Sequence, residues 1–147
     1  MDRYLYVSSD SSKTVYPDNN PESFTVHLEQ PLDLPGTWYC GLKELYFSGE
    51  FKINKRGLGH LPKVAPQHLY VCTDIVEGTV VSGVYLPLLR RSVIRKKFEH
   101  TFLEPYYFKV VNQRLSSITV YVLDHRLKPV VFKKGPLVCL LHFKKHV

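Results

Sequence analysis

Residues 16–45 read YPDNNPESFTVHLEQPLDLPGTWYCGLKEL, and this stretch decides the fold. Turn-forming residues at 17–21 lead into a run in which apolar and polar residues alternate strictly. A Pro–Gly turn at 35–36 then precedes a second, more apolar run. Alternation with a period of two is typical of a strand that buries one face, so the stretch predicts two strands bracketed by turns. The predicted core positions of these strands are Phe24, Val26, Leu28, Trp38, Cys40 and Leu42.

The same alternation recurs along most of the chain, whereas no window shows the apolar period of 3.6 that predicts helix. The run SITVYVLD, for example, places Ile118, Val120 and Val122 on one inner face. The sequence therefore predicts an all-β fold of about eight short antiparallel strands with little helix. Eight strands in two sheets is the number of a jelly roll, but alternation does not separate a jelly roll from another Greek-key sandwich or barrel. Gly41 marks either a bulge or a close backbone approach.

The chain of 147 residues fits one domain, 1–147, which is long enough to bury a core. Its least regular part, 49–67, is basic and rich in Gly and Pro, and predicts a loop at one end of the domain. Residues 125–136 predict a hairpin-like connection, because turn-forming residues begin and end it. The runs 84–89 and 103–111 hold more apolar and aromatic side chains than one sandwich core needs.

Twenty lysines and arginines against 13 acidic residues give a net charge of +7. This balance favours an acidic partner such as nucleic acid or an acidic protein face, and equally a solvated surface that aids solubility. The densest basic run, 90–97, fits phosphate contact or docking, and with equal weight an edge strand protected against stray pairing. The basic clusters are Lys52, Lys55 and Arg56; Arg90, Arg91, Arg95, Lys96 and Lys97; Lys133 and Lys134; Lys144 and Lys145.

No residue pattern points to catalysis, a cofactor or a metal, so the chain is predicted not to be an enzyme. The seven histidines are scattered without metal-ligand spacing, and no phosphate-binding glycine loop or serine nucleophile motif occurs. His27 and His142 fall on strands and are predicted to be partly exposed. Three cysteines in apolar strands, without C-x-x-C spacing, predict buried reduced thiols and a reducing compartment. No signal peptide or membrane-spanning run is evident, so no membrane contact is expected.

Three ordered blocks of the sequence resemble the small capsid proteins of Polinton (Maverick) elements and adintovirus-like DNA viruses. The first is Y-P-D-N at 16–19 followed by W-x-x-G-L-x-E-L at 38–45. The second, within 69–90, contains L-Y-V, D-I-V-E and P-L-L-R. The third, within 116–145, is a strand, a P-V-x-F turn and a final strand containing L-H-F. Family members carry a long insertion after the first block, where this chain has only the loop 49–67.

The resemblance implies a single jelly-roll β-sandwich that serves as the penton, the vertex subunit beside a double jelly-roll major capsid protein. It implies a homo-oligomer, expected to be a pentamer, in a virion that assembles inside the host cell, in the nucleus. The basic surface would contact packaged DNA. The residues expected at a subunit or partner interface are Arg90, Arg91, Arg95, Lys96, Lys97, Tyr106 and Tyr107.

Two other functions fit the sequence less well. A nucleic-acid-binding β-barrel module would suit the charge, and exposed aromatics beside basic residues would stack bases. The aromatic residues available for this are Tyr4, Tyr6, Tyr106, Tyr107 and Phe108. A sugar-binding jelly roll is disfavoured, because the single tryptophan, Trp38, lies on a core-like strand.

Overall fold

The computed structural model describes residues 2–48, 50–57, 59–94 and 99–146, and over these residues the regular structure is all strand. All strand pairings are antiparallel. The strands are β1 (Arg3–Ser8), β2 (Ser23–Asp33), β3 (Trp38–Tyr46), β4 (His68–Thr73), β5 (Thr79–Val81), β6 (Val84–Leu86), β7 (Leu88–Val93), β8 (Glu99–Thr101), β9 (Tyr107–Lys109), β10 (Arg114–Leu123) and β11 (Val138–Lys145).

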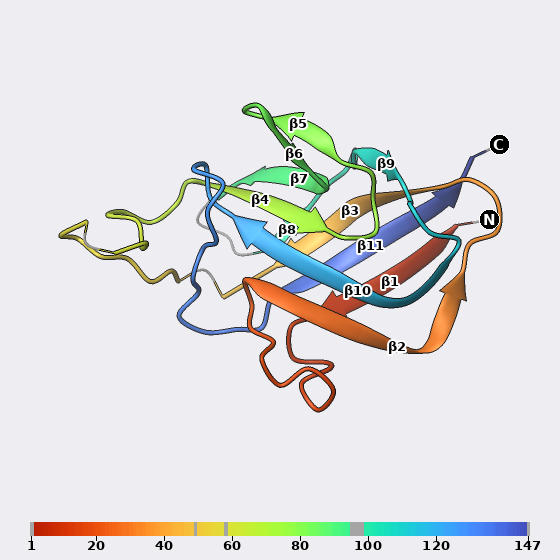
Figure 1. Ribbon diagram of the computed structural model, residues 1–147, viewed down its shortest axis with the longest axis horizontal. Coiled ribbons are helices and arrows are strands. Elements are labelled where there is room, and N and C mark those ends of the chain that lie inside the picture. The colour runs from red at the N-terminus through yellow and green to blue at the C-terminus, as the bar shows by residue number, and fades with distance from the viewer. Residues whose placement is uncertain (1, 49, 58, 95–98, 147) are drawn as a thin grey trace.

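Two sheets face each other (Figure 1). One has the order β1-β11-β3-β8, with β9 also paired to β3, and the other has the order β2-β10-β4-β7. The chain alternates between the sheets from β1 to β4 and again from β10 to β11, which is the winding of a jelly roll. The all-β sandwich expected from the sequence is confirmed. The short strands β5 and β6 form a separate hairpin.

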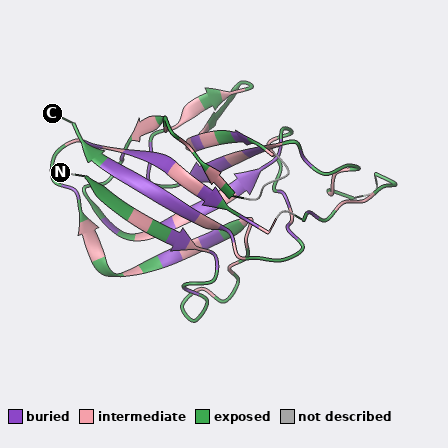
Figure 2. Ribbon diagram, turned by 180° about the vertical axis from the view of Figure 1, so that it is seen from behind, coloured by how far each residue is buried: buried purple, intermediate pink, exposed green. Residues whose placement is uncertain are grey.

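The core lies between the sheets, where the inward residues of each alternating strand meet (Figure 2). Of the nine core positions chosen from the sequence, eight are buried and Leu28 is half-buried against the core. The eight are Phe24, Val26, Trp38, Cys40, Leu42, Ile118, Val120 and Val122. Each large apolar side chain buried in this way contributes roughly 1.5–3 kcal/mol to folding.

Gly41, on β3, pairs with Tyr107 of the short neighbouring strand β9. A Cβ at this position would lie 2.8 Å from the Tyr106 carbonyl oxygen and 3.0 Å from the Tyr107 ring. The close backbone approach therefore explains the glycine. A register shift against β11 lies next to it along β3, because Leu141 pairs with Leu42 whereas Leu140 pairs with Glu44.

The two ends of the sandwich differ. The N- and C-termini lie at one end, and the loops 47–67 and 124–137 lie at the other (Figure 1). The expected hairpin-like connection at 125–136 is wrong, because β10 and β11 belong to different sheets. A tight turn does reverse the chain at 124–128, but Val130, Phe132 and Leu137 are then buried, which carries the segment across to the other sheet.

Candidate interaction surfaces

Arg90, on β7, is held by the segment that precedes β9. Its guanidinium carbon lies 4.4 Å from the centre of the Phe102 ring and 4.2 Å from the centre of the Tyr106 ring. Its Nη1 donates a hydrogen bond of 2.9 Å to the Glu104 carbonyl oxygen. A planar guanidinium between two rings is a cation–π arrangement, so Arg90 braces this segment within its own chain.

The other interface residues chosen from the sequence have four different outcomes. Arg91, next along β7, is exposed, and no ion pair within the described part of the chain engages it, which leaves its charge available. Tyr106 is 61% exposed although Arg90 stacks on its ring. Tyr107 is half-buried in an intramolecular cluster. The remaining three, Arg95, Lys96 and Lys97, lie outside the described residues.

The cluster that contains Tyr107 surrounds His142 on the outer face of β11. The Tyr107 hydroxyl lies 2.8 Å from His142 Nδ1, and the Asp2 carboxylate lies 3.1 Å from Nε2. The Tyr4 ring stacks on the imidazole with 4.5 Å between centroids, and Lys144 Nζ lies 3.8 Å from the centre of the Tyr107 ring. Burial, followed by the nearby Tyr4 and Asp2, raises the pKa of Tyr107. The prediction of a partly exposed His142 is wrong, since only 8% of it is exposed beneath Tyr4.

The two long flanks of the sandwich both expose apolar side chains. On the flank formed by β1 and β2, Tyr4 and Tyr6 are 59% and 64% exposed. The opposite flank is formed by β7, β9 and the β5–β6 hairpin (Figure 1). There, the exposed apolar residues are Val80, Val84, Tyr85, Leu103 and Tyr106. The runs 84–89 and 103–111, which hold more apolar side chains than one core needs, supply four of these exposed residues.

The loops 50–67 and 124–134 form what we call the basic end of the molecule. They lie side by side, because Lys52 N donates to the Val131 carbonyl at 2.7 Å and Lys133 N donates to the Glu50 carbonyl at 3.0 Å. Phe51 and Phe132 form the bridge between them and bury their rings together, 4.8 Å apart. Two basic clusters that are separate in the sequence, 52–56 and 133–134, thus meet at one end.

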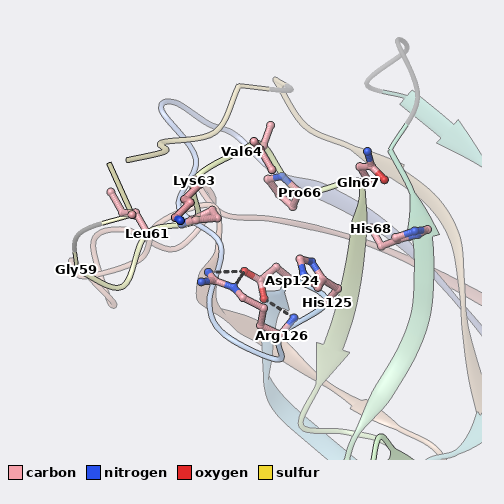
Figure 3. Close-up of a pocket in the computed structure, with 13 residues that line it drawn as sticks. Gly59, Leu61, Lys63, Val64, Pro66, Gln67, His68, Asp124, His125 and Arg126 are labelled. Carbon is pink, nitrogen blue, oxygen red and sulfur yellow. Dashed lines mark hydrogen bonds and ion pairs between the residues drawn. The ribbon is translucent and has the colours of Figure 1, made fainter. Parts of the chain in front are cut away.

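A cavity of about 690 Å³ opens at the basic end, between loop 57–68 and the turn 124–126 (Figure 3). Lys63, Val64 and Pro66 line one side, and Asp124 and Arg126 line the other. Its lining mixes apolar side chains with cations. No sequence motif marked this cavity, because it forms only when the two loops are brought together.

Asp124 is fully buried and organises the turn. Its carboxylate accepts hydrogen bonds from the Arg126 backbone at 2.8 Å, from Arg126 Nε at 3.0 Å and from Arg126 Nη2 at 2.8 Å. Lys128 N adds a fourth bond at 3.3 Å. Burial alone would raise the pKa of Asp124, but the bonds from Arg126 and Lys128 outweigh it and hold that pKa below its usual range.

Reactive-site chemistry is not evident in the described part of the chain. Its residues contain no group of three or more His, Cys, Asp or Glu placed to hold a metal ion. Cys40, Cys72 and Cys139 are free and buried, as predicted. Burial raises the pKa of Cys72 and of Cys139 to about 12 and raises that of Cys40 further, so the thiols stay protonated and unreactive. The described residues also include no helix long and apolar enough to span a membrane.

Comparison with known proteins gives a structural match. No protein-family model matches the chain, and no curated protein matches it significantly. Among solved structures, the crystal structure of the selenomethionine-labelled mavirus penton protein matches with a TM-score of 0.59 and 7% sequence identity. The match covers 99% of this chain and 100% of that chain. The jelly roll is shared from end to end.

The match bears on the resemblance seen in the sequence. It supports a jelly roll of the kind found in a penton protein, whereas the specific likeness to Polinton and adintovirus-like proteins stays a prediction. The TM-score establishes the fold, and at 7% identity the role has to be argued from the surfaces.

Proposed function

We propose that this chain is a structural subunit of a viral capsid, a penton-like protein of the virion. The observation that carries the proposal is the end-to-end structural match to the mavirus penton protein, which spans 99% of this chain. In the same proposal the subunit forms a ring, expected to be a pentamer, beside a double jelly-roll major capsid protein. Assembly inside the host cell, in the nucleus, and contact with packaged DNA belong to the proposal too. The role depends on shape and requires no catalysis.

The exposed flanks support assembly into a ring. A ring of identical subunits uses head-to-tail contacts, in which one surface of each subunit fits a different surface of its neighbour. The chain exposes apolar side chains on two opposite flanks, as such contacts require: Tyr4 and Tyr6 on β1, and Val80 and Leu103 beside β7. Exposed apolar patches on an otherwise polar protein commonly mark interaction sites.

The alternative functions have less support. For base stacking, ring faces must be open beside cations, but His142 covers one face of Tyr4 and Arg90 covers one face of Tyr106. Tyr6 is exposed, but it lines a hollow together with the acidic Glu44 and Glu99. Lys144 likewise lies over Tyr107. For sugar binding, an exposed tryptophan is the usual platform, whereas Trp38 is 5% exposed.

The mass of the purified protein in solution tests the proposal. Light scattering over a range of concentrations should show a discrete oligomer of five copies of the 17.1 kDa chain. A chain that stays monomeric at every concentration, with and without a major capsid protein, would contradict the vertex role.

A pair of variants tests the head-to-tail arrangement. Tyr6→Lys places a charge on the β1 flank, and Val80→Lys with Leu103→Lys places charges on the opposite flank; all three positions are exposed, so the fold should persist. Each variant alone should be monomeric. An equimolar mixture should give 1:1 dimers and nothing larger, because only one pair of intact surfaces can meet. The matched control is Val15→Lys, in the loop between β1 and β2, which should leave the oligomer intact.

A further inference from the structure

We propose that the basic end binds the phosphate backbone of double-stranded nucleic acid without reading its sequence. The proposed capsid role, on which this rests, supplies the reason for a capsid subunit to meet nucleic acid. The inference adds which surface makes the contact and by what chemistry.

The net charge of the chain is concentrated at this end. Segments 50–67 and 124–134 contain eight lysines and arginines and two acidic residues, so they hold +6 of the total of +7. All eight cations are exposed, and among the described residues seven of them have no ion pair. The seven are Lys52, Lys55, Arg56, Lys63, Lys128, Lys133 and Lys134. The rest of the molecule is close to neutral.

The two segments hold these cations together on one surface. Phe51 and Phe132 turn inward, so their chain neighbours Lys52 and Lys133 turn outward along the same bridge. Arg126 ties the segments a second time, because its Nη2 donates to the His60 carbonyl oxygen at 3.3 Å while Asp124 holds the same guanidinium. Charges fixed side by side attract a polyanion more strongly than charges on free tails, because less entropy is lost on binding.

The surroundings favour a duplex backbone over single-stranded bases or an acidic peptide. Single strands are bound by stacking on exposed rings, but Phe47, Phe51 and Phe132 at this end are all buried. An acidic peptide anchored in the cavity would need several of the protein's cations to line that cavity. Of the eight cations, only Lys63 and Arg126 do so. The others spread over the end, which suits a duplex that presents one charge per ~1.7 Å of its axis.

The neighbouring acidic residues leave this surface open. The loop 9–22 carries Asp10, Asp18 and Glu22, but it projects in a different direction from loop 50–67 (Figure 1). Glu22 is also turned inward, where its Oε2 lies 3.4 Å from the Phe132 backbone nitrogen.

Anisotropy of two fluorescent 20-base-pair duplexes of unrelated sequence, titrated with the full chain between about 50 and 200 mM KCl, tests the inference. We expect saturable binding, equal for both sequences, with log K falling linearly with log salt. A variant with Lys52, Lys55, Lys128 and Lys133 all changed to Gln should bind at least tenfold more weakly. Its salt slope should be shallower by about one for each phosphate contact removed.

The control variant loses four exposed cations elsewhere: Lys13, Lys109, Arg114 and Lys145, all changed to Gln. It should bind as the unmodified chain does. Equal weakening of both variants would show that net charge alone drives binding, and would overturn the assignment of the surface. Polyglutamate that competes as well as duplex at equal charge concentration, or no saturable binding at the lowest salt, would also overturn it. None of these results bears on oligomer mass, so a failure here is separate from a failure of the capsid proposal.

Discussion

Arg126 Nη2 lies 2.8 Å from the Asp124 carboxylate oxygen, within a turn that also reaches the carbonyl oxygen of His60. Asp124 is fully buried, whereas the Arg126 side chain is 32% exposed. The pair therefore joins the sandwich to the outer loop at the basic end. A buried carboxylate is tolerated here because four donors satisfy it.

Replacing Asp124 with Asn should destabilise the protein by about 1–3 kcal/mol at neutral pH, because donors in the turn lose their charged acceptor. The pKa of Asp124 is lower when folded, so its ionisation adds stability above the unfolded value of about 4, and this stability is lost as the pH falls further. Denaturant melts of both proteins from pH 7 to pH 3 should show the difference shrinking with acidity. A difference that stays constant or grows would contradict this role of the carboxylate.

Trp38→Ala should destabilise the protein by about 3–5 kcal/mol, because it leaves a cavity between the sheets. The Trp38 side chain also donates from Nε1 to the Pro35 carbonyl at 2.9 Å, and this bond to the preceding turn would be lost. Tyr6→Ala, at a 64% exposed aromatic, is the control and should shift stability by no more than about 0.5 kcal/mol. Similar shifts in the denaturation midpoints of the two variants would show that Trp38 is not a core residue.

Strand content and core were accessible from the sequence because alternation reports directly on which face of a strand is buried. Phe24, Val26 and Ile118 are examples: each sits in a strict alternation and each is buried. His142 is an exception: it faces outward on its strand but is buried, because the rings of Tyr4 and Tyr107 cover it. Side chains that cover a sheet from outside leave no periodic signal.

The interaction surfaces were less accessible, because they depend on long-range contacts. Lys52 and Lys133 are 81 positions apart and become neighbours only through the bridge between Phe51 and Phe132. The run 90–97 was a stronger local signal, but Arg90 in it is engaged by Phe102 and Tyr106. Local charge density identifies cations, whereas the fold decides which of them are free to meet a partner.

Gly41→Ala should destabilise the protein by about 1–3 kcal/mol, because the new methyl group would force β9 away from β3. The nearest atom is the Tyr106 backbone oxygen, at 2.8 Å, which cannot rotate away as a flexible side chain would. Ser116→Ala, at an exposed position on β10, serves as the control. Amide exchange should speed up at Tyr107–Lys109 in the Gly41 variant alone, and unchanged exchange there would argue against the clash.

The thiols of Cys40, Cys72 and Cys139 should react slowly with a thiol reagent at pH 8 in the folded protein. All three are buried, and with pKa values of about 12 for Cys72 and Cys139 almost no thiolate is present. In denaturant, all three should label at the rate of free cysteine, which provides the control. Rapid labelling of two or more thiols in the native protein would contradict their burial.

Arg90 and Arg91 are adjacent in the sequence, but we expect substitutions at the two positions to have different effects. Arg90→Ala removes a guanidinium from between Phe102 and Tyr106 together with its bond to the Glu104 carbonyl, and should destabilise the protein by about 1–2 kcal/mol. Arg91→Ala should change stability by less than about 0.5 kcal/mol, since its side chain is exposed. Melting midpoints measure the first effect, and oligomer mass under increasing salt measures any contribution of Arg91 to assembly. Arg90→Lys is the sharper comparison, because an ammonium keeps the charge but cannot stack as a plane between two rings, so it should restore only part of the loss. If Arg90→Ala and Arg91→Ala have the same melting midpoint, the two rings do not hold Arg90, and both arginines are available to a partner.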